Sequence, residues 1–205
     1  SKDKPEVLVH TKISDAEIQF SKDGPPVNNL SGTLDIARNM LSFEVNSGKI
    51  ADFKLLDAAI FIPNLSKAND KMRLSGSLAG DGASFANLNA LAPFENLTFK
   101  YPSDVSLNKP ITLKIDLRVD QLKKPKYEYA IAAYLNKNEL GLKNKKMSPI
   151  LLSGVLNFSN NGVTGRDLEA SFVKEKFNLD VETNKELTLK FKSFNKQELT
   201  GYLVV

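Results

Sequence analysis

The residue types that most often carry chemistry are scarce in this chain. Its 205 residues include one histidine, His10, and no cysteine. Thiol catalysis, disulfides, and zinc sites built from Cys or several His residues are therefore excluded by counting. A hydrolytic triad would need His10, which follows an apolar stretch at residues 7–9 and has no nucleophile motif beside it. We expect His10 to be a surface residue and the protein not to be an enzyme.

Carboxylate pairs are numerous, but residues of opposite charge surround them. Asp116 and Asp120 share the polar side of one apolar-polar stretch with Lys114 and Arg118. Cross-strand ion pairs explain this arrangement better than the two-carboxylate chemistry of glycoside hydrolysis. No acidic loop has the ligand spacing of a calcium site, and the glycines form no phosphate-binding loop. The sequence therefore predicts no metal and no cofactor.

The charge balance argues against a nucleic-acid partner. There are 28 Lys and Arg residues against 24 Asp and Glu, a formal net charge of +4, and lysines occur from Lys2 to Lys196. Proteins that bind nucleic acid usually concentrate Arg and Lys in one stripe, often with stacking aromatics. We interpret the lysines as a solvated polar face. No apolar run approaches the roughly 18 residues of a membrane span, and no signal peptide opens the chain.

The secondary structure that must position any site is predicted by apolar and polar residues that alternate with a period of two. In residues 111–119, five aliphatic side chains point one way and polar side chains the other. About a dozen such stretches are separated by turn-forming residues, among them Arg38-Asn39, Asn46-Ser47-Gly48 and Asn136-Lys137-Asn138. The pattern predicts a mainly β protein with a long antiparallel sheet of hairpins. Apolar spacing of three predicts one short helix around residues 84–91.

A short string recurs along the chain. Leu-Ser-Gly at residues 30–32 appears again at residues 74–76 and 152–154. Repeated hairpin units that each leave an apolar face uncovered must stack to bury it. We therefore predict two units in a continuous sheet, residues 1–120 with the short helix, and residues 121–205 as a truncated repeat. The glycine lies on the apolar side, where the sheet can bend sharply or admit a close approach to its backbone.

These strands resemble the AsmA-like superfamily, and within it the YhdP type. The likeness runs in order through residues 16–20, 25–26, 30–34, 46–50, 57–65, 74–80, the short helix, and 111–119, and it restarts over residues 127–183. The resemblance implies a bridge-like lipid transfer protein, with a sheet rolled into an open hydrophobic trough similar to a β-taco. It also implies a periplasmic location, a parent protein anchored in the inner membrane of a Gram-negative envelope, and carriage of phospholipid toward the outer membrane.

One-sided alternation supplies a continuous apolar lining for such a groove. The candidate lining residues are Leu34, Ile36, Phe43, Ile60, Ile62, Leu74, Leu78, Ile111, Leu113, Ile115, Leu117, Val119, Ile131, Leu135, Leu156, Phe172, Leu179, Leu189 and Phe191. The same alternation predicts a closed sandwich core equally well, and periodicity alone favours that core. The resemblance favours the groove. The alternative function is a closed β-sandwich module for adhesion or glycan binding, with no lipid site.

A basic cluster is expected at one rim of the sheet. If Asn136-Lys137-Asn138 is a hairpin turn, the flanking strands bring Lys145 and Lys146 near Lys124 and Lys126. These lysines are candidate contacts for lipid phosphates or an anionic membrane surface. Protection of the sheet edge against strand addition is the simpler explanation.

The two ends of the chain also carry an expectation. The abrupt start and the apolar run at residues 203–205 are typical of an excised piece of a longer protein. The membrane anchor would then belong to missing parts of the parent chain. An interrupted sheet leaves unpaired backbone groups at its edges, so we expect edge-to-edge self-association of the piece.

Overall fold

Strands make up nearly all of the structure. The computed structural model describes residues 8–19, 26–65, 71–85, 105–120, 126–142, 150–172, 175–183 and 187–193. The elements are β1 (Leu8–Ile18), β2 (Val27–Ala37), β3 (Met40–Ile50), β4 (Phe53–Ile62), β5 (Met72–Asp81), the 3-10 turn η1 (Gly82–Ser84), β6 (Val105–Asn108), β7 (Pro110–Asp120), β8 (Lys126–Leu142), β9 (Ile150–Ser159), β10 (Gly162–Phe172), β11 (Glu175–Thr183) and β12 (Leu187–Ser193). The predicted mainly β fold is confirmed. Most of the predicted helix around residues 84–91 lies outside the described residues.

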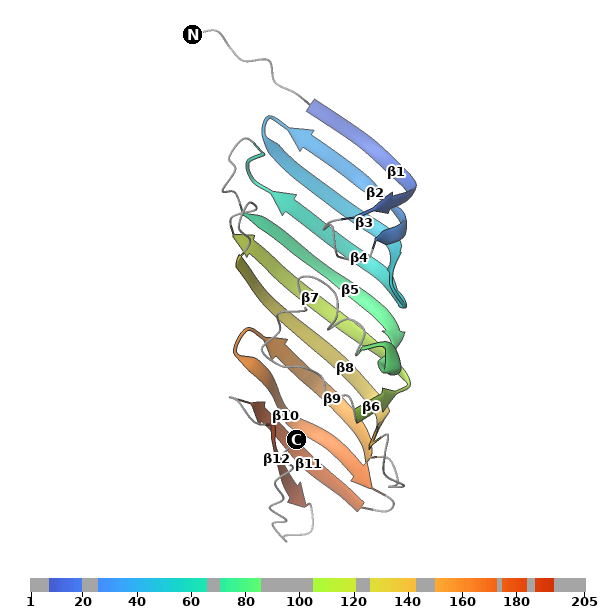
Figure 1. Cartoon of the computed structure of the whole chain (residues 1–205), viewed down its shortest axis with the longest axis vertical. Helices are drawn as coiled ribbons and strands as arrows, with labels where there is room; N and C mark the ends of the chain where they lie inside the picture. Colours follow the sequence, from blue (N-terminus) through green and yellow to red (C-terminus); the bar gives the residue numbers. More distant parts are fainter. Residues whose placement is uncertain are drawn as a thin grey trace. The chain divides into compact units, whose positions relative to one another are not determined.

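The strands form one open antiparallel sheet. Neighbours pair in the order β1-β2-β3-β4-β5-β7-β8-β9-β10-β11-β12, with β6 beside β8 (Figure 1). Chain neighbours become sheet neighbours directly where two-residue turns join consecutive strands, as at residues 38–39, 51–52 and 160–161, which is the arrangement that hairpins impose. The order begins at β1 and ends at β12 and does not close. The predicted open sheet is confirmed.

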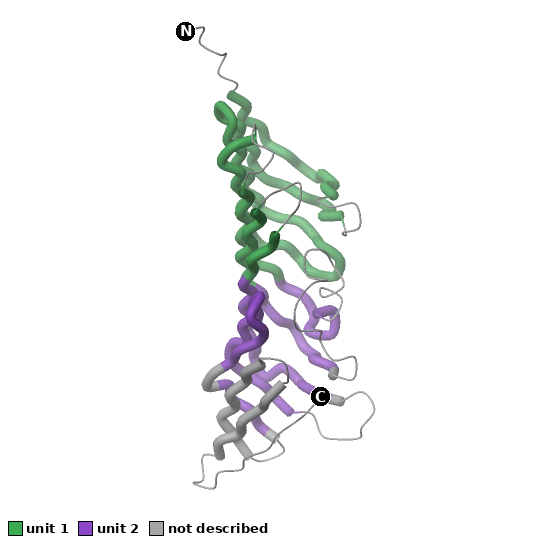
Figure 2. The backbone as a smooth tube through the Cα atoms, turned by 60° about the vertical axis from the view of Figure 1, so that its left-hand side comes forward, with its two compact units in different colours: residues 1–78, 114–129 green, residues 79–113, 130–205 purple. Residues whose placement is uncertain are grey.

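Contacts divide the chain into two compact units. Unit 1 comprises Ser1–Leu78 and Lys114–Tyr129, and unit 2 comprises Ala79–Leu113 and Ala130–Val205 (Figure 2). Each of β7 and β8 therefore contributes residues to both units. The division at residue 120 stays a prediction.

Several strands are longer than the sequence pattern predicts. β3 continues through Asn46-Ser47-Gly48, so the turn predicted there is wrong, and the chain turns at residues 51–52 instead. β8 likewise continues through Asn136-Lys137-Asn138, so the hairpin predicted there is wrong. The turn predicted at Arg38-Asn39 is confirmed, and the chain also turns at Asn160-Asn161.

Residues 136–138 form a β-bulge rather than a turn. The register of β8 with β9 passes from Leu135↔Gly154 to Asn138↔Leu152, which leaves one extra residue on β8. Lys137 has a φ of 53°, in the left-handed region. Residues that tolerate positive φ or bond their own backbone suit bulges as well as turns, which explains the wrong prediction.

The side chain of Asn138 fastens this bulge to the rest of unit 2. Asn138 is fully buried. Its Nδ2 lies 3.0, 3.0 and 3.1 Å from the carbonyl oxygens of Asn108, Lys109 and Pro110. Its Oδ1 accepts a hydrogen bond from the backbone N–H of Asn136 at 2.7 Å. The two Nδ2 protons are thus shared among three carbonyl oxygens at the joint between β6 and β7. One buried side chain therefore holds that joint against β8.

The register in which β1 pairs with β2 is repeated where β8 pairs with β9. The offset is constant at 122 residues, from Val9 to Ile131 and from Ile36 to Phe158. The matching pairs are Val9↔Ile36 with Ile131↔Phe158, Thr11↔Leu34 with Ala133↔Leu156, and Ile13↔Gly32 with Leu135↔Gly154. The repeated Leu-Ser-Gly string at residues 30–32 and 152–154 therefore marks a repeat of strand register.

The serines of the strings at residues 30–32 and 152–154 have equivalent hydrogen-bond partners. Asp15, with a φ of 52°, is the left-handed residue of the β1 bulge and the counterpart of Lys137. The hydroxyl of Ser31 accepts the backbone N–H of Asp15 at 3.3 Å, and the hydroxyl of Ser153 accepts that of Lys137 at 3.0 Å. A bulge takes the N–H of its extra residue out of the strand ladder, so the serine supplies the missing acceptor.

Replacing Asn138 with leucine should destabilise the protein. Leucine has a similar volume but no donor, so the carbonyls of Asn108, Lys109 and Pro110 lose the hydrogen bonds from the buried Asn138 amide. We expect a loss of about 3 kcal/mol in the free energy of unfolding. Urea unfolding followed by circular dichroism measures this loss. The control is Asn136→Leu, because the side chain of Asn136 is exposed and should contribute less than about 0.5 kcal/mol. Equal losses in both variants would contradict the role of the Asn138 amide.

Candidate functional site

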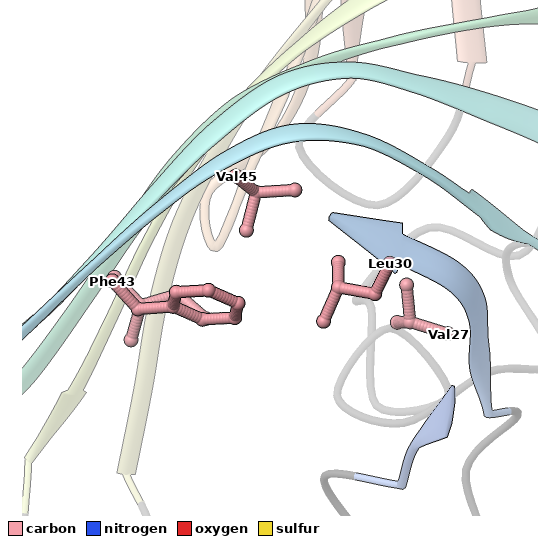
Figure 3. Packing of buried hydrophobic residues seen from close by; sticks show 5 residues of the cluster. Val27, Leu30, Phe43 and Val45 are labelled. Atoms are coloured by element: carbon pink, nitrogen blue, oxygen red, sulfur yellow. The ribbon is translucent and has the colours of Figure 1, made fainter. Parts of the chain in front are cut away.

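The apolar face of unit 1 has a buried centre. Val27, Leu30, Phe43, Val45 and Ile60 form one cluster in which each residue is at most 6% exposed. Their side chains gather on the inner side of the curved strands (Figure 3). The predicted lining residues Phe43 and Ile60 belong to this cluster. These two residues therefore contribute to the stability of the unit.

Around this centre the aliphatic side chains are only half-buried. The half-buried residues that sequence analysis placed on the lining are Leu34, Ile36, Ile62 and Leu74. Leu41, which register places beside Ile36 and Ile62, is half-buried too and was missed, although its alternation with Phe43 marks it. Residues of these types are usually fully buried when a second layer covers them. Among the described residues, this part of the face is open.

β7 shows the clearest alternation and is fully buried on its apolar side. Its aliphatic residues, Ile111, Leu113, Ile115, Leu117 and Val119, are between 0% and 8% exposed. Lys114, Asp116 and Arg118 point to the exposed side of the strand. The predicted alternation is confirmed, and within it Leu113 has the surroundings of a core residue.

The other candidate lining residues divide by burial. Ile131 and Leu135 are 6% exposed, Leu78 is 4% exposed, and Leu156 is half-buried. The side chains of Phe172, Leu179, Leu189 and Phe191 lie outside the described part of the structure, although β10, β11 and β12 pair there through their backbones. Whether lipid contacts any of these residues stays a prediction.

The expected lysine cluster loses its geometric basis. β8 continues as a strand through the segment that was expected to turn, so no hairpin at residues 136–138 brings the flanking lysines together. Lys126 is exposed at the start of β8. Lys124, Lys145 and Lys146 lie outside the described residues.

The opposite face of the sheet is polar and carries exposed pairs of polar side chains. Nδ1 of His10 lies 2.5 Å from Oδ1 of Asp35, with exposed side-chain fractions of 66% and 49%. Lys109 contacts Glu139 at 3.0 Å, and Lys71 contacts Asp120 at 3.7 Å. Exposed pairs of this kind add little stability. They keep this face wet, and His10 lies at the surface as expected.

A polar cleft lies where β1 and β2 bulge. Its volume is about 430 Å³, and it is lined by Asp15, Ala16, Glu17, Asn28, Asn29, Lys49 and Ala51. None of these residues belongs to the candidate lining. Across the described ranges, no group of three or more His, Cys, Asp or Glu residues is placed to hold a metal ion. Within the same ranges, no helix has the length and apolar character needed to cross a membrane.

Comparison with known proteins finds a family to which the chain is similar. The model of the family described as YhdP protein matches residues 1–198. This range includes every strand from β1 to β12. No curated protein and no solved structure matches the chain.

A charge should affect the buried and the half-buried positions of the apolar face differently. Leu113→Asp places a carboxylate where no water reaches, and we expect a loss of about 4 kcal/mol or more, enough to unfold the domain. Ile62→Asp leaves the carboxylate in contact with water and should cost about 1 kcal/mol. Circular dichroism and urea unfolding distinguish the two variants. Unfolding of Ile62→Asp would mean that the face around Ile62 is a sealed core.

Proposed function

The chain belongs to the YhdP family, whose members act in lipid transport in the cell envelope, and we propose that it binds phospholipid acyl chains on the apolar face of its sheet. In this proposal the chain lies in the periplasm of a Gram-negative cell, as part of a protein anchored in the inner membrane. It takes part in phospholipid transport from the inner to the outer membrane. The process is binding and passage, with no covalent step.

The half-buried aliphatic residues of unit 1 are the observation that carries this proposal. Leu34, Leu41 and Leu74 pack against the buried cluster, and register places Ile36 and Ile62 beside Leu41. All five residues are half-buried and retain contact with solvent. An acyl chain of 16 carbons costs about 13 kcal/mol to expose to water, at about 0.8 kcal/mol per CH₂. A carrier therefore needs a row of apolar contacts without gaps. Half-buried aliphatic side chains provide such contacts and become more buried when an acyl chain lies on them.

A β-sheet suits this task because its backbone polar groups are already paired. The ladder hydrogen bonds between strands satisfy N–H and C=O groups, so a strand presents mainly side chains to a ligand lying on its face. Alternation then puts aliphatic groups on one side and charged groups on the other. An acyl chain on the apolar side finds no hydrogen-bonding group that would hold it at one place, which favours its passage along the face.

The alternative of a closed β-sandwich does not fit the described strands. They pair in a single open order from β1 to β12, whereas a sandwich needs two sheets packed face to face. A glycan site would also need exposed aromatic side chains, and the chain has no tryptophan. Among the described residues, Phe61 and Tyr134 are 42% and 40% exposed, but they lie on β4 and β8, which do not pair with each other.

The protein purified from Gram-negative cells should carry phospholipid, seen as adducts in native mass spectrometry. It should also take up a fluorescent phospholipid, and Ile62→Asp should weaken this uptake by about tenfold or more because the carboxylate would be buried beside an acyl chain. Phe61→Asp is the matched control. Phe61 is the neighbouring residue on the same strand, is also apolar, and is 42% exposed on the opposite face. Uptake by Phe61→Asp should equal that of the unchanged protein.

Two results would contradict the proposal. One is a protein that is free of lipid as purified and takes up no fluorescent phospholipid. The other is equal uptake by folded Ile62→Asp and Phe61→Asp proteins, since uptake would then not depend on the apolar face.

A further inference from the structure

The repeat provides two equivalent positions on the apolar face, one in each unit. In unit 1 the position is formed by Val9, Ile36 and Leu41, which lie side by side on β1, β2 and β3. In unit 2 the same register places Ile131, Phe158 and Val163 side by side on β8, β9 and β10. All three residues are displaced by the common offset of 122, for example from Leu41 to Val163. We call these the first-copy site and the second-copy site.

The two sites differ in exposure. All three residues of the first-copy site are half-buried. In the second-copy site, Ile131, Phe158 and Val163 are 6%, 7% and 3% exposed. Because β1 comes first in the strand order, Val9 has a neighbouring strand on one side only among the described residues. Ile36 and Leu41 have strands on both sides, so their exposure does not come from a missing neighbouring strand.

Phe85 packs against Phe158 of the second-copy site. Its ring packs against the ring of Phe158, with centroids 5.2 Å apart and planes inclined at 52°. Phe85 is itself 4% exposed. A tilted aromatic pair at this separation is a favourable contact. The residue reaches Phe158 from a remote part of the chain, directly after η1.

The turn that carries Phe85 is anchored at its base. Oδ1 of Asp81 caps η1 by accepting the N–H of Ala83 at 2.9 Å. The N–H of Gly82 donates to the carbonyl oxygen of Lys109 at 2.8 Å. A Cβ on Gly82 would lie 2.7 Å from the carbonyl oxygen of Leu107, so only glycine fits there. The same Lys109 oxygen accepts from Asn138, so the joint between β6 and β7 positions this turn.

We infer that Phe85 occupies, on the second-copy site, the place that a phospholipid acyl chain takes on the first-copy site. This inference rests on the proposed function. An aromatic ring and a run of methylene groups make the same kind of dispersion contact with aliphatic and aromatic neighbours. Phe85 is then a specificity-determining residue, because it closes one of two equivalent positions to lipid and leaves the other open.

The absence of tryptophan makes this inference directly testable. A single introduced tryptophan reports contact with lipid when its emission is quenched by phospholipid with brominated acyl chains. Ile36→Trp reports the first-copy site and Phe158→Trp the second-copy site. Phe61→Trp, on the polar face, is the control and should keep its emission. Circular dichroism establishes that each variant is folded.

We expect quenching in Ile36→Trp and none in Phe158→Trp while Phe85 is present. The double variant Phe158→Trp/Phe85→Ala should lose emission, because an apolar hollow without its ring accepts an apolar ligand. If this double variant does not fold, Phe158→Trp/Phe85→Leu opens part of the same hollow and is used in its place.

The outcomes separate the inference from the proposed function. Quenching of Phe158→Trp with Phe85 present, or no change on replacing Phe85 while Ile36→Trp is quenched, would overturn the inference alone. Emission unchanged in every variant, including Ile36→Trp, would contradict lipid binding itself.

Discussion

The hydrogen bond from a left-handed bulge residue to a serine on the next strand sets the geometry of both units. A bulge bends its strand and increases the local twist. Asp15 and Lys137 adopt this backbone, and Ser31 and Ser153 accept their N–H groups. In unit 1, the apolar residues of the curved strands meet on the inner side of the curve. A flat sheet would present the same residues without a concave surface on which an acyl chain could lie.

The two copies of this bend are secured by different side chains, and this difference has consequences. In unit 2, Asn138 reaches three carbonyls of the joint between β6 and β7, and the Lys109 carbonyl also holds Gly82. Its counterpart in unit 1 is Ala16, which has no polar side chain, and there Nδ2 of Asn29 donates to Oδ1 of Asp15 at 2.6 Å. Among the described residues, the anchored turn that ends in an aromatic residue thus lies beside the second copy of the bend.

Local sequence patterns predicted the elements that depend on nearest neighbours. The alternation of residues 111–119 gave β7 and its buried side, and Arg38-Asn39 gave the turn between β2 and β3. The bulge at Asn138 was not predictable, because asparagine suits a turn equally well and its carbonyl partners lie 28 to 30 residues away. Exposure was not predictable either. Leu34 and Leu113 have the same alternating surroundings, yet Leu34 is half-buried and Leu113 is fully buried.

The difference in exposure separates stability from binding. Residues such as Leu30 and Leu113 are already buried, so they stabilise the fold and gain nothing from a ligand. Residues such as Ile36 and Ile62 leave apolar area in water, which costs about 25 cal/mol for each Å² and makes the surface prone to association. That cost is removed when another apolar group covers the face. In unit 2 the chain supplies such a group in Phe85. In unit 1 the proposed acyl chain would supply it.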